Sequence, residues 1–254
     1  MIPSNYHTHT TFCHGADTPE ELVLKAIELG CPALGLTSHS YTSFDGSYCM
    51  TREGTKAYIA QVRALQEKYR DQIKLYLGVE QDFYSEDPTD AYDYAIGSVH
   101  YVKKDGIYLS VDESKENQKR FVKECYNGDW YAFAEDYFAT VARVYEKTGC
   151  QIIAHFDLLT KFNSNGDLFD TGHPRYLTAA EKALEKLMQS PAALEINFGA
   201  IARGYTQKPY PEPWVIRKWL AAGKKVCYSS DCHDKNRLLD YYTDYEALIA
   251  QCAK

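Results

Sequence analysis

Residues 5–39 read NYHTHTTFCHGADTPEELVLKAIELGCPALGLTSH, and they predict a strand, a helix and a second strand in succession. Residues 5–10 are expected to form the first strand. The Thr-Pro-Glu-Glu sequence at 18–21 supplies a capping Thr, a Pro at the first helical position and a Glu at the third, which is typical of a helix start. Gly30 is a suitable helix end, and residues 33–38 are again strand-like. Two strands joined by a helix are expected to be parallel, with a right-handed crossover.

The same alternation continues along the rest of the chain. Five more stretches have the apolar character of strands, at 73–83, 94–102, 151–156, 193–198 and 225–230. Helical stretches are expected at 51–69, 114–127, 130–148, 174–190, 212–222 and 235–252. Seven strands separated mostly by helices favour a closed (β/α) barrel over an open doubly wound sheet. The sequence has no G-x-G-x-x-G or Walker loop, which weakens the open nucleotide-binding alternative.

Composition and charge narrow the class of protein. A chain of 254 residues with no low-complexity stretch, repeat or linker is expected to form one domain over residues 1–254. We expect no membrane partner and no signal peptide, because there is no long apolar run and no basic, apolar leader. Eight cysteines without a C-x-x-C pair indicate a reducing cytoplasm rather than a disulfide framework or a thiolate zinc site. The net charge of −7 argues against a nucleic-acid partner.

Side chains that can bind metals occur where the predicted strands end. In a (β/α) barrel these ends converge on one mouth, and that mouth is where the chemistry takes place. Six of the seven strands end in such residues or are followed closely by them: His7, His9, His14, His39, Glu80, His100, His155, Asp231 and His233. A single His in a strand is more often an ordinary hydrogen-bonded residue. Coincidence at six strand ends is hard to explain by chance, so the sequence predicts a centre for several metal ions.

Spacing within these clusters indicates which side chains share an ion. Residues i and i+2 of a strand point to the same face, so His7 and His9 can bind one ion. The same holds for Asp231 and His233 if strand geometry persists to that point. Imidazole nitrogens and carboxylate oxygens suit Zn²⁺, Mn²⁺ or Fe²⁺. His173 precedes a proline at a predicted helix start and is expected to be structural.

The sixth predicted strand ends without a histidine, at Glu195 and Asn197. Both side chains are expected on one side of the strand. They could support the metal ligands or contact a substrate, and they could equally be ordinary hydrogen-bonded residues at the barrel mouth. The sequence leaves both interpretations open.

These residues make the chain resemble the PHP (polymerase and histidinol phosphatase) superfamily, and within it the monofunctional histidinol-phosphatase branch. The resemblance covers almost the whole chain and rests on YHTHTTFCHG, GLTSHS, LGVEQDF, YAIGSVHYV, IIAHFDLLTKF, EINFGAIARGYTQKPYPEPW and YSSDCHD. It implies a distorted (β/α)7 TIM-like barrel with three divalent metal ions at the C-terminal mouth. One segment departs from the family pattern, because residues 198–203 read FGAIAR where the family usually has small residues and then Gly-Leu-Arg-Lys.

The resemblance also implies how the ligands are divided among the ions. The sets are His7, His9, Glu80 and Asp231 for the first ion; a bridging Glu80 with His100 and His155 for the second; and His14, His39 and His233 for the third. All nine positions carry the expected type of ligand. Lys161 and Arg203, in loops expected at the mouth, are candidates to bind the phosphate oxygens of a substrate.

The expected reaction is hydrolysis of a phosphate monoester. Adjacent divalent ions lower the pKa of a shared water and neutralise charge on the phosphoryl oxygens. We therefore expect metal-bound hydroxide to attack phosphorus in line, without a covalent enzyme intermediate. The catalytic proton for the leaving alkoxide could come from Asp231, from His233 or from a metal-bound water.

The substrate that the resemblance implies is L-histidinol phosphate, hydrolysed to L-histidinol and phosphate in histidine biosynthesis. A PHP phosphoesterase acting on other monoesters, such as nucleotides or phosphotyrosine, is the alternative enzyme. A metal-binding protein without turnover is the non-enzymatic alternative. The sequence leaves the oligomeric state and the identity of the metal open.

Overall fold

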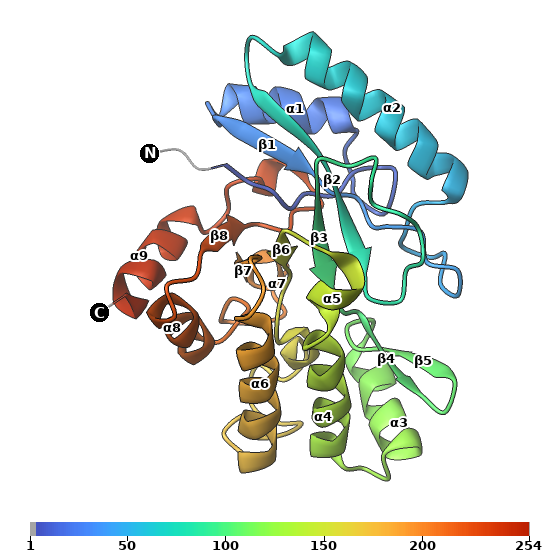
Figure 1. The fold of residues 1–254 in the computed structure, drawn as a ribbon, viewed down its shortest axis with the longest axis vertical. Helices are drawn as coiled ribbons and strands as arrows, with labels where there is room; N and C mark the ends of the chain where they lie inside the picture. The colour runs from blue at the N-terminus through green and yellow to red at the C-terminus, as the bar shows by residue number, and fades with distance from the viewer. Residues whose placement is uncertain (1–3, 254) are drawn as a thin grey trace.

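The computed structural model describes residues 4–253 and has a parallel sheet of six strands at its centre (Figure 1). The strands are β1 (Ala33–Leu36), β2 (Lys74–Asp82), β3 (Tyr94–Ser98), β6 (Ile152–Ile153), β7 (Ala193–Asn197) and β8 (Val226–Ser229). They are neighbours in this same order, and every adjacent pair is parallel. Their C-terminal ends therefore lie at one mouth, as expected for a (β/α) barrel.

Residues 5–9 close this sheet although they do not form a regular strand. Asn5 makes an isolated parallel bridge to Leu34 of β1, whereas Thr8 makes one to Cys232, just beyond β8. The backbone of this extended segment alternates between its two neighbours, so neither side has a continuous ladder. The first predicted strand is thus an extended segment between β1 and β8. Seven segments around one axis make the predicted distorted (β/α)7 barrel.

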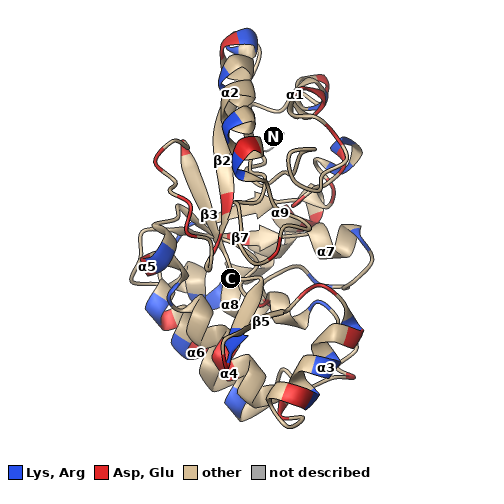
Figure 2. Cartoon of the chain, turned by 90° about the vertical axis from the view of Figure 1, so that its right-hand side faces the viewer, with Lys and Arg blue, Asp and Glu red and all other residues tan. Residues whose placement is uncertain are grey.

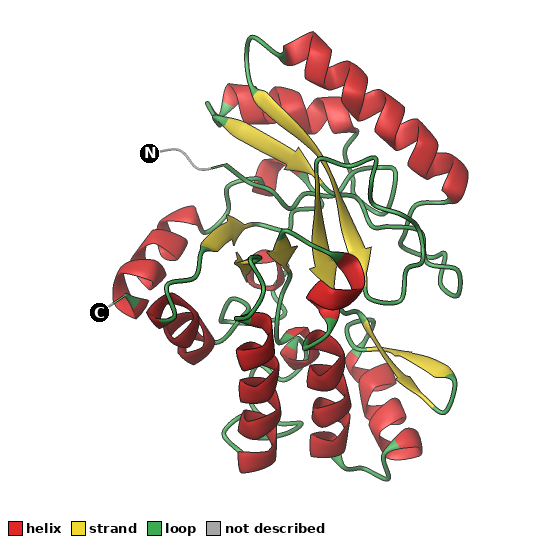
Figure 3. Cartoon of the chain, in the orientation of Figure 1, coloured by secondary structure: helices red, strands yellow, loops and turns green. Residues whose placement is uncertain are grey.

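Helices lie around the outside of the strands (Figure 3). Their bounds are α1 (Pro19–Glu28), α2 (Arg52–Tyr69), α3 (Lys115–Cys125), α4 (Trp130–Val141), α5 (Val144–Thr148), α6 (Pro174–Leu187), α7 (Gly199–Ala202), α8 (Pro213–Ala221) and α9 (Tyr242–Cys252). Short 3₁₀ turns occur at η1 (Leu158–Thr160) and η2 (Lys235–Arg237). Lys and Arg are interspersed with Asp and Glu along the outer helices (Figure 2). Within residues 4–253, no helix is both long and apolar enough to cross a membrane.

The start of α1 shows why the first crossover forms where the sequence predicts it. The Thr18 hydroxyl accepts a hydrogen bond from the Glu21 amide, and the Glu21 carboxylate accepts one from the Thr18 amide at 2.9 Å. This reciprocal capping box satisfies two amides that the helix leaves free. Gly30 follows the helix with φ of 71°, a left-handed conformation that favours glycine. Leu22 and Val23 are then fully buried against the sheet.

Besides the first strand, three predicted elements differ clearly from the structure. The strand expected at 94–102 ends at Ser98, and β4 (Tyr101–Lys104) then pairs antiparallel with β5 (Ile107–Ser110). The hairpin turns at Asp105-Gly106, where both residues have positive φ, a conformation that an Asp-Gly pair favours. The helix expected at 130–148 divides into α4 and α5. The last helix begins at Tyr242, because residues 235–237 form only the η2 turn.

Candidate metal centre

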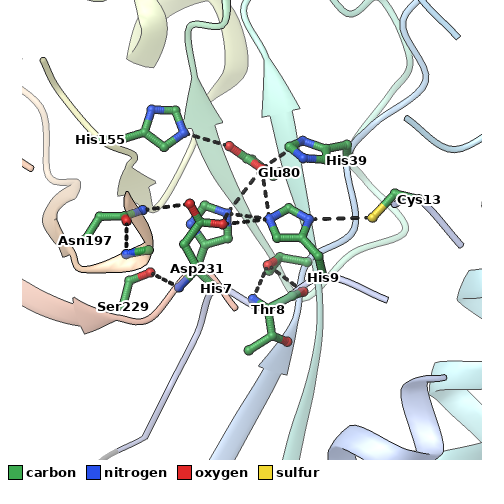
Figure 4. A network of polar contacts seen from close by, with 12 residues as sticks. His7, Thr8, His9, Cys13, His39, Glu80, His155, Asn197, Ser229 and Asp231 are labelled. Carbon is green, nitrogen blue, oxygen red and sulfur yellow. Dashed lines mark hydrogen bonds and ion pairs between the residues drawn. The ribbon is translucent and has the colours of Figure 1, made fainter. Parts of the chain in front are cut away.

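Glu80, near the C-terminal end of β2, is at the centre of the site (Figure 4). Its carboxylate is 1% exposed. Five imidazole nitrogens surround it: His39 Nδ1 at 2.8 Å, His155 Nε2 at 3.0 Å, His7 Nε2 at 3.1 Å, His100 Nε2 at 3.3 Å and His9 Nε2 at 3.4 Å. Burial by itself would raise the pKa of Glu80, but the facing imidazoles hold it well below its ordinary value. The carboxylate is therefore an anion in a nearly dry, nitrogen-rich environment.

His7 and His9 project from the extended segment toward the same point. Their Nε2 atoms are 3.1 Å apart, so at most one of the two nitrogens can carry a hydrogen. Burial would lower the pKa of His7, but Glu195, Glu80 and Asp231 together raise it well above its ordinary value. The pKa of His9 is held well below its ordinary value by burial and by two neighbouring imidazoles. The two Nε2 atoms therefore lie side by side, as the i, i+2 spacing of His7 and His9 predicts.

Asp231 and His233 reach the site by a different route from the one expected. Strand β8 ends at Ser229, and Asp231 has φ of 46°, so strand geometry does not persist. A non-glycine residue in this left-handed region is strained, and such strain is often found at functional sites. The turn nevertheless brings Asp231 Oδ1 to 3.1 Å from His9 Nε2, and the His233 ring stacks on His9 with centroids 4.2 Å apart. Asp231 and His233 are therefore brought to the site by a turn and not by a shared strand face.

His14 and His39 complete the rim of the site. The exposed His14 ring stacks between two others, with centroids 5.0 Å from His39 and 4.4 Å from His233. His14 Nδ1 lies 3.1 Å from the carbonyl oxygen of Tyr48, to which it can donate, leaving Nε2 free to bind a cation. Burial lowers the pKa of His39 to about 4, so this ring is neutral near pH 7.

His100 and His155 follow β3 and β6 and face Glu80 from the other side. His100 Nδ1 is 3.3 Å from Asp82 Oδ2, a carboxylate that orients the ring. Burial would lower the pKa of His100, but Glu80 and Asp82 raise it to about 9. The backbone amide of His155 donates to Glu195 Oε2 at 2.9 Å. A carboxylate behind the site thus orients the His100 ring, whereas at His155 the carboxylate of Glu195 holds the backbone.

The donor atoms fit divalent cations. Among the described residues, Glu80 Oε2, His155 Nδ1 and His233 Nε2 are buried without a hydrogen-bond partner. Nitrogens lie close to Glu80 Oε2 without hydrogen-bond alignment, as expected of ligands arranged around an ion. Three groups have ligand atoms within 4.8 Å of one another: His7, His9 and Glu80; His39, Glu80 and His100; and His9, His39 and His233. Nitrogen and oxygen donors of this kind suit Zn²⁺, Mn²⁺ or Fe²⁺.

These three groups agree only in part with the sets that the resemblance implies. His7, His9 and Glu80 coincide with the first set, and Glu80 with His100 belongs to the second. His9 occupies the position that the resemblance gives to His14 beside His39 and His233. Since the rings of His9, His14, His39 and His233 form one stacked cluster, the geometry accommodates either choice.

Glu195 and Asn197 contact the candidate ligands directly. Glu195 is fully buried, and its Oε1 atom lies 2.5 Å from His7 Nδ1. Asn197 Nδ2 donates to Glu195 Oε2 at 3.0 Å and lies 3.2 Å from Asp231 Oδ2. Of the two interpretations that the sequence leaves open, the structure favours the supporting one. Glu195 orients His7 in the manner in which carboxylates orient metal-binding histidines.

Lys161 and Arg203 line the same cavity of about 420 Å³ as five of the seven histidines of the site, together with Asp112 and Tyr205. Lys161 Nζ is 3.0 Å from Asp112 Oδ2 and donates to the Asp112 carbonyl oxygen at 2.8 Å. Arg203 Nη2 is 3.3 Å from Asp231 Oδ2, and Nη1 is 2.8 Å from His233 Nδ1. Both cations are thus at the mouth, as predicted, and each is paired with a carboxylate. Asp112 follows the unpredicted hairpin, so no spacing in the sequence pointed to it.

His173 lies outside this cluster. It caps α6, where its Nδ1 accepts a hydrogen bond from the Arg175 amide at 3.2 Å. Its ring stacks on Tyr131 with centroids 3.8 Å apart. These contacts agree with the structural role expected from its place before a proline.

Comparisons with known proteins agree with this architecture. The PHP domain family model matches residues 5–199. A protein of Bacillus subtilis (strain 168) named histidinol-phosphatase is 26% identical over 97% of this chain and 98% of its own length. A solved structure from Listeria monocytogenes has a TM-score of 0.81 at 21% identity, covering 95% of this chain and 99% of that one. A Lactococcus lactis histidinol phosphate phosphatase, complexed with Zn, L-histidinol and phosphate, has a TM-score of 0.73 at 20% identity, covering 98% and 93%. The chain belongs to the PHP domain family.

Proposed function

We propose that this protein is a metal-dependent phosphoric monoester hydrolase, and specifically a histidinol-phosphatase that converts L-histidinol phosphate into L-histidinol and phosphate. The observation that carries the proposal is Glu80, a buried carboxylate facing five imidazoles in a cavity that also contains Lys161 and Arg203. The name of the Bacillus subtilis relative, which aligns over nearly the full length of both chains, supports the choice of substrate.

We assign three divalent ions to the site, held by the residues that the resemblance implies: His7, His9, His14, His39, Glu80, His100, His155, Asp231 and His233. Zinc in the Lactococcus lactis structure supports Zn²⁺ ahead of Mn²⁺ or Fe²⁺. When bound, such ions activate water near neutral pH and offset negative charge on phosphoryl oxygens. The structure's own contribution is the orientation of the ligands, for example of His7 by Glu195 and of His100 by Asp82.

The residues at the mouth act on the substrate. Lys161 and Arg203 would exchange their carboxylate partners for phosphate oxygens, which guanidinium and ammonium groups bind well. The leaving alkoxide of histidinol needs a proton. The candidate donors are Asp231 and His233, which lie at the edge of the cavity beside Arg203, and a metal-bound water.

The rest of the cavity suits an ester that also carries a positive amine. Three acidic side chains, Asp45, Asp112 and Glu113, line it beside the aromatic rings of Tyr48 and Tyr101. Asp45 and Asp112 have hydrogen-bond partners, whereas Glu113 has none among the described residues. The negative charge of Glu113 is therefore available to an ammonium group of the substrate. An aminoalkyl phosphate fits this mixture of charges better than a nucleotide, which is a polyanion without an ammonium group.

The deciding experiment measures phosphate release by the metal-loaded protein from L-histidinol phosphate, p-nitrophenyl phosphate and a nucleoside monophosphate. We expect kcat/KM to favour L-histidinol phosphate by roughly a thousandfold, which equals about 4 kcal/mol of differential transition-state binding. Comparable slow rates on all three esters would overturn the histidinol assignment. Full activity after chelation and removal of the metals would overturn the metal-dependent mechanism.

We also propose that residues 1–254 act as one domain in a reducing cytoplasm. All eight cysteines lie within residues 4–253, and none of them forms a disulfide there, which agrees with a reducing environment. The proposed partner is the small-molecule ester alone.

A further inference from the structure

His9, like His39 and Glu80, is a donor shared between two groups of candidate ligands. Its ring is fully buried, and its Nε2 atom lies 3.1 Å from Asp231 Oδ1 and 3.4 Å from Glu80 Oε2. It belongs to two of the three groups of ligand atoms, one with His7 and one with His39. The orientation and tautomer of this one ring therefore affect more than one cation position.

The outer nitrogens of several other histidines face oxygen. His7 Nδ1 faces the Glu195 carboxylate, and His100 Nδ1 faces Asp82. His14 Nδ1 faces a carbonyl oxygen, that of Tyr48. Partners of this kind hold the hydrogen of a metal-binding imidazole on the outer nitrogen. With the hydrogen held there, the inner nitrogen is the one that would give its lone pair to a bound cation.

The outer nitrogen of His9 instead faces sulfur. Cys13 Sγ lies 3.5 Å from His9 Nδ1, on the side of the ring opposite Glu80 and Asp231 (Figure 4). Because the thiol is behind the ring, it is placed to support His9 and not to bind the ion that His9 would hold. Its distance falls within the range of hydrogen bonds to sulfur.

The loop fixes the direction of the thiol. The backbone amide of Cys13 donates to the Thr10 carbonyl oxygen at 3.0 Å, and Sγ donates to the same oxygen at 3.4 Å. The thiol hydrogen is thus directed to Thr10, and the sulfur lone pairs are left for His9. The loop packs closely on the ligand segment, since a Cβ on Gly15 would come within 2.5 Å of the His9 carbonyl oxygen.

We propose that Cys13 is a positioning residue that accepts the Nδ1 hydrogen of His9 and so keeps Nε2 as the metal-binding lone pair. A neutral sulfur acceptor sets the tautomer without adding a further negative charge to a site that already holds Glu80 and Asp231. This role rests on the proposed metal-dependent function, because a fixed lone pair on Nε2 has a use only if His9 binds a cation.

The test uses the full chain with Cys13→Ala, Cys13→Ser and the control Cys125→Ala, a partly exposed cysteine at the end of α3. Titration with Co²⁺, followed by its visible absorption, reports metal affinity and ligand geometry. Nitrogen-15 NMR of the metal-free protein reports the His9 tautomer. We expect Cys13→Ala to weaken Co²⁺ binding by about 10- to 100-fold and to reduce the Nδ1-protonated tautomer. Cys13→Ser should restore part of both, and the control should change neither.

Unchanged Co²⁺ affinity and an unchanged His9 tautomer in Cys13→Ala would overturn this role. If that variant proves unfolded in a thermal melt, Cys13→Val, which nearly keeps the side-chain volume and removes the acceptor, decides, and wild-type values of both readouts would then count against the role. Neither readout depends on turnover. A protein that binds Co²⁺ normally but hydrolyses no ester would refute the proposed phosphatase and leave the role of Cys13 to be judged by the tautomer.

Discussion

The proposed metal ligands around Glu80, called the inner ligands below, and the cationic pair Lys161 and Arg203 are held in different ways. Glu80 and three of the imidazoles around it, His39, His100 and His155, line the same cavity as the cationic pair, whereas His7 and His9 are fully buried. Most of the inner ligands follow strand ends or the segment that closes the barrel, and the outer nitrogens of His7 and His100 are braced by the buried carboxylates of Glu195 and Asp82. The cationic pair lies on short irregular elements, directly after η1 and α7. Its members are held by single carboxylates, Asp112 and Asp231.

This difference indicates two kinds of task. A metal ligand has to be rigid, because its lone pair must already point at the ion, and strand ends braced by carboxylates provide that rigidity. A cation proposed to bind phosphate has to exchange partners when the substrate arrives, and partly exposed ion pairs such as Lys161–Asp112 and Arg203–Asp231 allow this. The inner ligands should therefore respond to substitution mainly in kcat and metal content, whereas the cationic pair should respond mainly through the substrate.

The largest effect is expected from Glu80→Gln, which removes the central anion and keeps the size of the side chain. We expect kcat to fall by about a thousandfold or more, since metal ions contribute several kcal/mol to such reactions. Metal content, measured by elemental analysis of the purified protein, should fall with it. Near-normal metal content and turnover in Glu80→Gln would show that Glu80 is not needed to bind metal, and the proposed difference between the inner ligands and the cationic pair would then be wrong.

The second prediction concerns Asp157, which precedes η1 and anchors the segment that carries Lys161. Its Oδ2 accepts the Glu212 amide at 2.9 Å, and burial raises its pKa from 3.8 to about 7. A carboxyl group with a raised folded-state pKa contributes stability below its unfolded pKa and loses it as the pH rises through the folded value. Asp157→Asn keeps the acceptor and removes this loss.

The variant should therefore gain free energy of unfolding relative to the wild type as the pH rises from 4 to 7. The slope should be about 1.4 kcal/mol per pH unit at most, and the total about 3 kcal/mol. Denaturant unfolding of both metal-free proteins across this range gives the comparison. A difference that is constant with pH would show that Asp157 ionises normally.

Arg203→Ala should lower kcat/KM by about a hundredfold, which is the order of the loss when one donor to a developing oxyanion is removed. Arg203→Lys should recover only part of this, because a lysine cannot reproduce the planar fork of the guanidinium group. Metal content should stay at the wild-type level in both variants. Loss of metal in Arg203→Ala would show instead that Arg203 supports metal binding by holding Asp231.

The smallest effect is expected from Glu195→Gln, which alters the support of His7 and leaves every ligand in place. Metal affinity should weaken by about 10- to 100-fold, as is typical for the outer partner of a ligating histidine. Saturating metal should then restore most of the turnover. Activity that stays low in excess metal would indicate a direct role of Glu195 in the reaction.

The positions of the inner ligands could be predicted from the sequence because a strand has a fixed period. His7 and His9 share a face by their spacing, and Glu80, His100 and His155 come directly at strand ends that a parallel barrel brings together. The hairpin of β4 and β5 was missed although the Asp105-Gly106 signal was present, since the apolar run through residue 102 concealed the break after Ser98. Asp112, at the end of that hairpin, was missed for the same reason.

The sequence by itself determined the barrel, its repeat of strand and helix, and the identity of the donors at its mouth, because these depend on local periodicity and on capping residues such as Thr18 and Glu21. Only the tertiary structure decided which groups stand behind the donors. Glu195 meets His7 across 188 positions of the chain, and Arg203 meets Asp231 through a left-handed turn. Such contacts depend on how separate strands and loops pack in space, and no spacing along one element encodes them.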